Sequence, residues 1–191
     1  LKQQFINKIE EYANKENIKY EQVNWYNDAL ILDEEKNIRE LQIYKEGKIY
    51  MQSLSSMLPP LILDPKNEKI LDMTASPGGK TTQIYNLSEK QALITAVEKN
   101  KIRADRLKYN LEKQGTSRVT VMLKDARKLD NFFSFDKILL DAPCSGLGVI
   151  NDNPDIKLNR EKESVKELNL EQLSILKTVS SYVKIGGYLY Y

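Results

Sequence analysis

The segment from residue 70 to residue 80 constrains the fold of this 191-residue chain more than any other stretch. It reads Ile-Leu-Asp-Met-Thr-Ala-Ser-Pro-Gly-Gly-Lys, so an apolar run that ends in Asp72 leads directly into a loop of small residues. Gly78 and Gly79 allow positive φ and close approach of a ligand to the backbone, and the helix N-terminus expected after them favours a carboxylate or a phosphate. The segment predicts a strand, a ligand loop and a helix.

From residue 69 onward, apolar runs and helical patterns alternate. We expect strands at 69–73, 92–97, 118–123, 136–140 and 187–191, and helices at about 78–87, 100–114 and 161–183. This order predicts an α/β fold in which helices cover both faces of a doubly wound parallel sheet. Ligands bind beyond the carboxyl ends of the strands in such sheets. Four acids lie at those ends in the sequence, namely Asp72, Glu98, Asp125 and Asp141.

Residues 1–46 predict a small α+β module. Apolar residues recur at helical spacing between positions 5 and 12, while 29–32 and 38–44 are typical of short strands joined by a turn. A helix is expected at 51–58, ending near Pro59 and Pro60, because proline disfavours a helical conformation in the preceding residue. The larger domain then spans 47–191. Because the chain stops inside an expected strand, we expect this domain to continue beyond Tyr191.

Composition narrows the chemistry that this chain can perform. No run approaches the ~18 apolar residues of a membrane span and the N-terminus lacks a signal-peptide pattern, which favours a cytoplasmic protein without membrane contact. With one cysteine, Cys144, and no histidine, we expect no internal disulfide and no metal site. Carboxylates, lysine or that thiol must therefore carry the reaction.

A basic segment from Lys99 to Lys128 has ten Lys and Arg residues against three Asp and Glu residues. Such a segment is typical of a solvated helix face, which is the interpretation we favour, and charge alone also permits nucleic-acid binding.

Two ligand classes fit the loop from Thr74 to Lys80. It falls one residue short of the phosphate loop G-x-x-x-x-G-K-[ST], but Thr74 stands where that loop has its first glycine and Pro77 removes one backbone amide. A nucleotide hydrolase would also give no reason for Glu98 or for a thiol close to Asp141. A structural turn without a ligand is a third possibility.

The other ligand class is S-adenosylmethionine. Its methionine end would lie over the loop residues, which are Thr74, Ala75, Ser76, Pro77, Gly78, Gly79 and Lys80. Glu98 would accept hydrogen bonds from the ribose hydroxyls and Asp125 from the adenine amine, since carboxylates suit ligand groups that donate. This interpretation explains the series of acids, which the alternatives do not.

Asp141 and Cys144 follow the expected strand 136–140 within the sequence Asp-Ala-Pro-Cys-Ser-Gly. A thiolate that adds to C6 of a pyrimidine makes C5 nucleophilic, which is a recognised role of covalent catalysis. Asp141 could bond the ring N3 and amino group as charge develops there. Lys80 is either an electrostatic helper or an ordinary lysine at the start of a helix.

These motifs resemble the Sun/Nop/Fmu family of RNA cytosine-5 methyltransferases. The resemblance covers 47–191 and rests on 49–60, 74–80, Glu98 with Arg103 and Asn110, Asp125, 141–146 and 186–187. It implies a Rossmann-like class I S-adenosylmethionine methyltransferase sheet that acts on a cytosine of ribosomal or transfer RNA. The cofactor would contact 74–80, Glu98, Asp125 and Asp141, and 1–46 resembles an RNA-contacting extension.

The resemblance also assigns roles to two cysteines, of which this sequence contains one. In the family the Pro-Cys cysteine, here Cys144, helps to release the product, and a later Thr-Cys cysteine attacks the base. Three explanations stay open: the second cysteine lies beyond residue 191, the protein binds RNA without methylating it, or Cys144 attacks by itself. The sequence leaves oligomeric state open, with a monomer slightly favoured.

Overall fold

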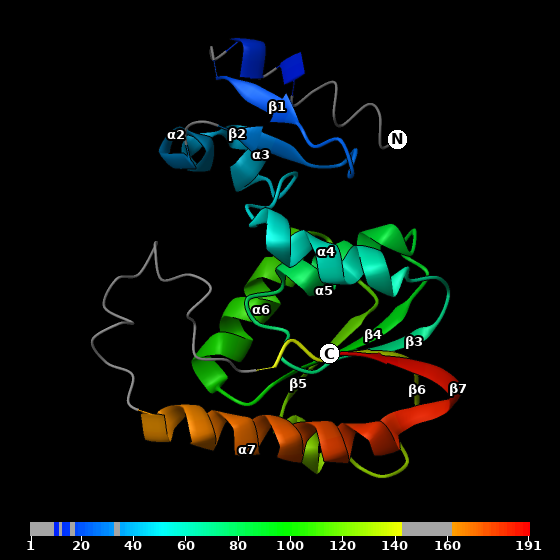
Figure 1. Cartoon of the computed structure of the whole chain (residues 1–191). Helices are drawn as coiled ribbons and strands as arrows, with labels where there is room; N and C mark the ends of the chain where they lie inside the picture. The colour runs from blue at the N-terminus through cyan, green and yellow to red at the C-terminus, as the bar shows by residue number, and fades with distance from the viewer. Residues whose placement is uncertain (1–9, 12, 16–17, 33–34, 143–161) are drawn as a thin grey trace. The chain divides into compact units, whose positions relative to one another are not determined.

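The computed structural model describes residues 10–142 and 162–191, apart from positions 12, 16–17 and 33–34 (Figure 1). The chain divides into two compact units, Leu1–Tyr50 and Met51–Tyr191. Cys144 and most of the helix expected at 5–12 lie outside the described residues.

The described part of the first unit includes a two-stranded antiparallel sheet followed by short helices. Strand β1 (Tyr20–Gln22) pairs with β2 (Leu30–Leu32), and α2 (Glu35–Glu40) and α3 (Gln42–Lys45) follow. The expectation of a strand at 38–44 is wrong. Buried Ile38 is the only one of its apolar residues that is fully covered, and the backbone N–H of Lys45 bonds to the carbonyl of Leu41 in a helical pattern. Arg39, Glu40 and Gln42 are good helix formers, and this local preference for a helix prevails.

The second unit is a five-stranded sheet with the order β5-β4-β3-β6-β7, in which every neighbouring pair is parallel. The strands are β3 (Lys69–Asp72), β4 (Leu93–Glu98), β5 (Val119–Leu123), β6 (Phe135–Leu139) and β7 (Val183–Tyr190). The helices are α4 (Leu54–Leu63), α5 (Gly79–Leu87), α6 (Lys101–Lys113) and α7 (Lys162–Val179), with short 3₁₀ turns η1 (Ala126–Lys128) and η4 (Ser180–Tyr182). The predicted doubly wound α/β fold is confirmed.

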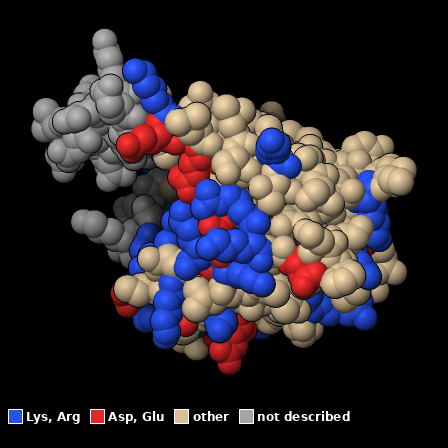
Figure 2. All heavy atoms as spheres, turned by 90° about the horizontal axis from the view of Figure 1, so that it is seen from below, with Lys and Arg blue, Asp and Glu red and all other residues tan. Residues whose placement is uncertain are grey.

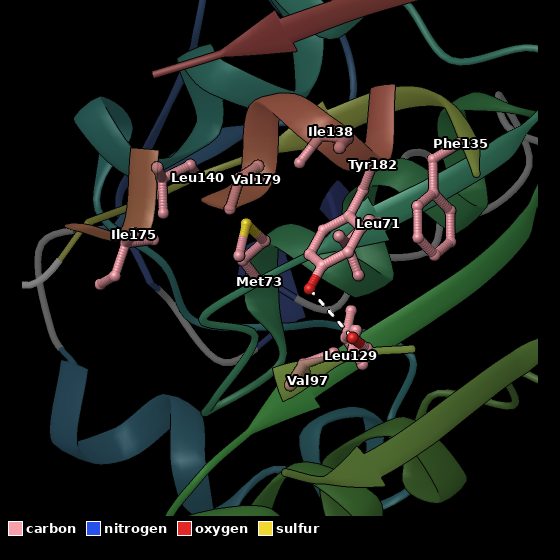
Figure 3. Close-up of a cluster of buried hydrophobic side chains, with 10 residues drawn as sticks. All are labelled: Leu71, Met73, Val97, Leu129, Phe135, Ile138, Leu140, Ile175, Val179 and Tyr182. Carbon is pink, nitrogen blue, oxygen red and sulfur yellow. Dashed lines mark hydrogen bonds between the residues drawn. The ribbon is translucent and has the colours of Figure 1, made fainter. Parts of the chain in front are cut away.

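Alternate residues of the strands pack into separate hydrophobic clusters on the two faces of this sheet. Ile70 packs with residues of α4 and α5 on one face, whereas Leu71 packs with residues of α7 on the other. Figure 1 shows the same layers, with α4, α5 and α6 on one side of the strands and α7 on the opposite side. The α7 core includes Met73, Val179 and Tyr182, whose side chains point toward one another in Figure 3. Burial on both faces explains why these strands are continuous apolar runs.

Helix α4 continues through both prolines to Leu63, so the expected end of this helix near residue 59 is wrong. Each proline lacks the N–H that would bond four residues back, which ordinarily disfavours a helix interior. Pro60 and Leu63 are buried, and Leu63 packs with Ile70 and Ile84 in the core shared with α5. Tertiary burial of this helix face therefore outweighs the local preference.

Candidate functional site

The carboxyl ends of the parallel strands bring the four predicted acids to one edge of the sheet. Asp72 and Glu98 are the last residues of β3 and β4, while Asp125 and Asp141 each follow their strand by two positions. The strands that carry them are neighbours in the order β5-β4-β3-β6. The structure therefore places all four along this edge, although their side chains have very different surroundings.

The glycine loop lies between β3 and α5 at this edge and is fastened to α6. Asn110 Nδ2 donates to the carbonyl oxygen of Pro77 at 2.7 Å, and Ser76 Oγ donates to the carbonyl oxygen of Arg103 at 2.9 Å. Gly78 has φ +111°, and a Cβ placed on it would lie 3.1 Å from Leu107 Cδ1. The loop conformation therefore requires glycine at position 78, as its sequence suggested.

Asp72 faces the inside of the protein and is only 1% exposed. Its Oδ2 accepts a hydrogen bond of 2.6 Å from Thr81 Oγ1. Burial raises the pKa of Asp72 from 3.8 to about 6, although the bond from Thr81, the charge of Lys80 and the backbone amide of Thr74 oppose this rise. The sequence placed Asp72 correctly at the edge but gave no sign that its carboxylate is fully covered.

Glu98 is also buried, with 5% of its side chain exposed, and its carboxylate is held in place by α6. The backbone N–H of Asn100 donates to Oε1 at 2.9 Å, and Arg103 Nε lies 3.2 Å from Oε2. A carboxylate with two fixed donors keeps further lone pairs for a ligand hydroxyl.

Asp125 forms a bidentate ion pair with Arg127, which sequence reasoning missed. Arg127 Nε lies 3.0 Å from Oδ1 and Nη2 lies 2.6 Å from Oδ2, and the backbone N–H of Arg127 also donates to Oδ1. These bonds to Arg127 are the main reason that the pKa of Asp125 falls from 3.8 to about 2. An arginine two residues after the acid is the signal that could have indicated this pair. A ligand amine would have to share the carboxylate with the guanidinium.

Lys80 joins the start of α5 to the segment after β6. Its Nζ lies 2.7 Å from Asp141 Oδ2 and donates to Ser56 Oγ at 3.3 Å. Thr74 Oγ1 donates to the carbonyl oxygen of Asp141 at 2.6 Å, so both ends of the glycine loop contact Asp141. Lys80 and Asp141, two of the predicted site residues, thus form an ion pair, while a catalytic role for Lys80 stays a prediction.

The basic segment 99–128 is partly neutralised within the structure. Among the described residues, basic side chains of this segment pair with acids in Lys99–Glu171, Lys101–Asp105, Arg103–Glu98 and Arg127–Asp125. Figure 2 shows Lys and Arg side chains gathered around acidic ones on the face that is seen from below. Within the described ranges, no three His, Cys, Asp or Glu residues gather into a possible metal site. No helix among the described residues is long and apolar enough to cross a membrane.

A wound parallel sheet with a glycine loop and acceptor carboxylates at its carboxyl edge defines a Rossmann-like nucleoside-binding protein. Residues 60–191 match the model of the family described as 16S rRNA methyltransferase RsmB/F. The chain belongs to this family of S-adenosylmethionine-dependent methyltransferases, as the resemblance in its motifs predicted. The phosphate-loop alternative is left without support.

Three relatives illustrate the similarity. A probable ribosomal RNA small subunit methyltransferase B of Coxiella burnetii is 31% identical over 95% of this chain and 44% of its own length. A tRNA (cytosine(72)-C(5))-methyltransferase of Pyrococcus horikoshii is 36% identical over 81% of this chain and 40% of its own. The crystal structure of NSun6 from Pyrococcus horikoshii with SFG, an S-adenosylmethionine analogue, is similar with a TM-score of 0.73 at 36% identity, over 79% of this chain and 39% of that one. The chain thus spans less than half the length of these relatives.

Proposed function

We propose that this chain forms the cofactor-binding and base-binding core of an S-adenosylmethionine-dependent methyltransferase that modifies C5 of a cytosine in ribosomal or transfer RNA. The observation that carries the proposal is the shared edge, where the glycine loop and Glu98 lie beside the Lys80–Asp141 pair. Family membership and the names of the relatives support the same reaction.

The residues at this edge fit S-adenosylmethionine. The positive φ of Gly78 leaves the loop without a side chain at that point, so a ligand can approach its backbone. Glu98 offers lone pairs to the two ribose hydroxyls, and Asp125 offers the lone pairs that Arg127 leaves free to the adenine amine. The cofactor supplies an electrophilic methyl group when it is bound.

A thiolate and a carboxylate would make C5 of the cytosine nucleophilic. A cysteine thiolate, from Cys144 or from a cysteine outside this sequence, adds to C6, and the electron pair of the C5–C6 double bond makes C5 nucleophilic. Asp141 would bond N3 and the amino group of the base, while Lys80 holds the Asp141 carboxylate in place at 2.7 Å. After methyl transfer, a base accepts the C5 proton, and the released electron pair re-forms the C5–C6 double bond and expels the thiolate from C6. Cytoplasmic location, a monomeric state and RNA contact by residues 1–46 remain part of this proposal.

Calorimetry with S-adenosylmethionine tests the proposal on the 191-residue chain. We expect a one-to-one complex, and replacement of Glu98 by Ala should cost about 1.5 to 3 kcal/mol of binding free energy, because hydrogen bonds to a charged group are lost. Glu112→Ala is the matched control, since Glu112 is an exposed acid on α6. No binding at millimolar cofactor would refute the proposal.

Assays with RNA on the complete gene product test the chemical step. Cys144→Ala should trap a covalent RNA adduct if Cys144 releases the product, and should abolish both activity and adduct if Cys144 is the attacking group. A gene product that binds RNA with steep salt dependence but transfers no methyl group would instead indicate a non-catalytic relative.

A further inference from the structure

Asp72 is the acid that the proposed reaction does not use, although it lies at the same edge as the others. Its carboxylate is almost fully covered, so it cannot meet a ligand directly. Burial of a carboxylate is costly unless a fixed donor compensates it, and the hydroxyl of Thr81 is such a donor. The position of Thr81 in the chain indicates what Asp72 does.

Asp72 and Thr81 stand on opposite sides of the glycine loop. Asp72 is the last residue of β3, whereas Thr81 belongs to the first turn of α5. The hydrogen bond of 2.6 Å between them therefore joins the entrance of the loop to its exit. Thr74 and Lys80 also contact Asp141, so the position of the loop affects the base-binding carboxylate as well.

We propose that Asp72 is a positioning residue that closes the glycine loop through its hydrogen bond with Thr81, and that S-adenosylmethionine binds tightly only to this closed loop. This inference rests on the proposed function. It requires the ionised carboxylate, because a protonated or amidated side chain is a weaker acceptor for the Thr81 hydroxyl.

The neighbouring residue Thr82 provides a matched control for Thr81. Both threonines are buried in the first turn of α5, but Thr82 Oγ1 has no hydrogen-bond partner in the part of the chain that the structure describes. Replacing either by valine removes a hydroxyl and preserves the shape of the side chain. Only the change at Thr81 removes a donor to Asp72.

The test measures the dissociation constant of S-adenosylmethionine by calorimetry on folded 191-residue variants at pH 7.5. We expect Thr81→Val and Asp72→Asn to weaken binding about tenfold, since each loses one hydrogen bond to a charged group. Thr81→Ser, which keeps the hydroxyl, and Thr82→Val should stay within about twofold of the original chain. Equal affinities of Thr81→Val and Thr82→Val would overturn the inference while leaving the proposed function intact.

A pH series separates positioning from a merely structural role and does not depend on how stable the valine variant is. The charged groups that act on Asp72 are Lys80, which favours its ionised form, and Asp141, which opposes it. The original chain should lose affinity as the pH falls from 7.5 through about 6, whereas Asp72→Asn should lack this step. The same pH profile in both proteins would contradict the inference. Absence of binding by the original chain at every pH would refute the proposed function as well.

Discussion

At the scale of single residues, Gly78 has the most demanding backbone among the loop glycines that the structure describes. Its φ of +111° lies outside the region that residues with a Cβ adopt readily, and Leu107 stands close to where that Cβ would be. Gly115 also has a positive φ, +67°, but has open space around it. Substitution of the two glycines therefore separates two contributions to the free energy of unfolding. One is the strain of a positive φ, and the other is the close contact with Leu107.

Gly78→Ala should lower the free energy of unfolding by more than about 2 kcal/mol and weaken cofactor binding, because strain and the Leu107 contact add together. Gly115→Ala should cost about 1 kcal/mol through the backbone alone and leave binding unchanged. Urea denaturation and calorimetry measure the two effects. Equal destabilisation of the two variants would contradict the packing argument.

Asp72 also predicts a pH-dependent stability. Its pKa is raised on folding from 3.8 to about 6, so the folded state holds this proton more tightly than the unfolded chain does. The stabilisation is fully present below pH 3.8 and is lost as the pH rises through 6, which amounts to about 3 kcal/mol at 1.36 kcal/mol per unit. The difference in unfolding free energy between the original chain and Asp72→Asn should follow this curve between pH 4 and 7. A constant difference would show that folding does not raise the pKa of Asp72.

At the scale of elements, a hydrogen bond connects the turn η4, at the end of α7, to Leu129, which follows η1. Tyr182 is buried in the α7 core, and its hydroxyl donates to the carbonyl oxygen of Leu129 at 3.1 Å (Figure 3). Tyr191 is a useful comparison, because its hydroxyl bonds to Gln172 Oε1 at 2.9 Å while the side chain is 68% exposed.

Tyr182→Phe should lower the free energy of unfolding by about 1 to 3 kcal/mol, since the change leaves a buried carbonyl without its donor. Tyr191→Phe should change it by less than about 0.5 kcal/mol, because water can replace an exposed partner. Thermal or urea unfolding of both variants provides the measurement. A larger effect at Tyr191 would show that the α7–η1 contact contributes little.

At the scale of the whole molecule, the site depends on strands that are far apart in the sequence. The bond from Thr74 to Asp141 joins residues 67 positions apart, and the pair of Lys80 and Asp141 joins residues 61 apart. Such contacts exist only when the sheet is folded, so ligand binding and folding must be thermodynamically linked.

S-adenosylmethionine at one hundred times its dissociation constant should therefore raise the unfolding free energy by about 2.7 kcal/mol, with a higher melting temperature. Glu98→Ala should abolish most of this shift at the same cofactor concentration, whereas Glu112→Ala should retain it. A cofactor that binds by calorimetry but leaves the melting temperature unchanged would mean that the unfolded chain binds it too. Differential scanning calorimetry gives the comparison.

Much of this architecture follows from local sequence. The apolar runs, the glycine loop and the helical patterns between them predicted each strand of the main sheet within a few residues, because burial on both faces demands continuous apolar strands. Parallel strands in turn place the ends at one edge, so the positions of Glu98, Asp125 and Asp141 could also be predicted.

Tertiary structure decided which groups each of those side chains contacts. It also decided where a helix continues against the conformational preference of its own residues. Packing between distant segments produces three such features. Asp72 is buried and bonded to Thr81, Lys80 pairs with Asp141, and α4 continues through two prolines. The segment 38–44 is a different case, because local preference decided it: Arg39, Glu40 and Gln42 are good helix formers. The sequence by itself determines the apolar periodicity of each strand and helix, and which residue types stand at the carboxyl edge of the sheet. Burial and charge partners come from three-dimensional contacts, whose energies exceed those local preferences.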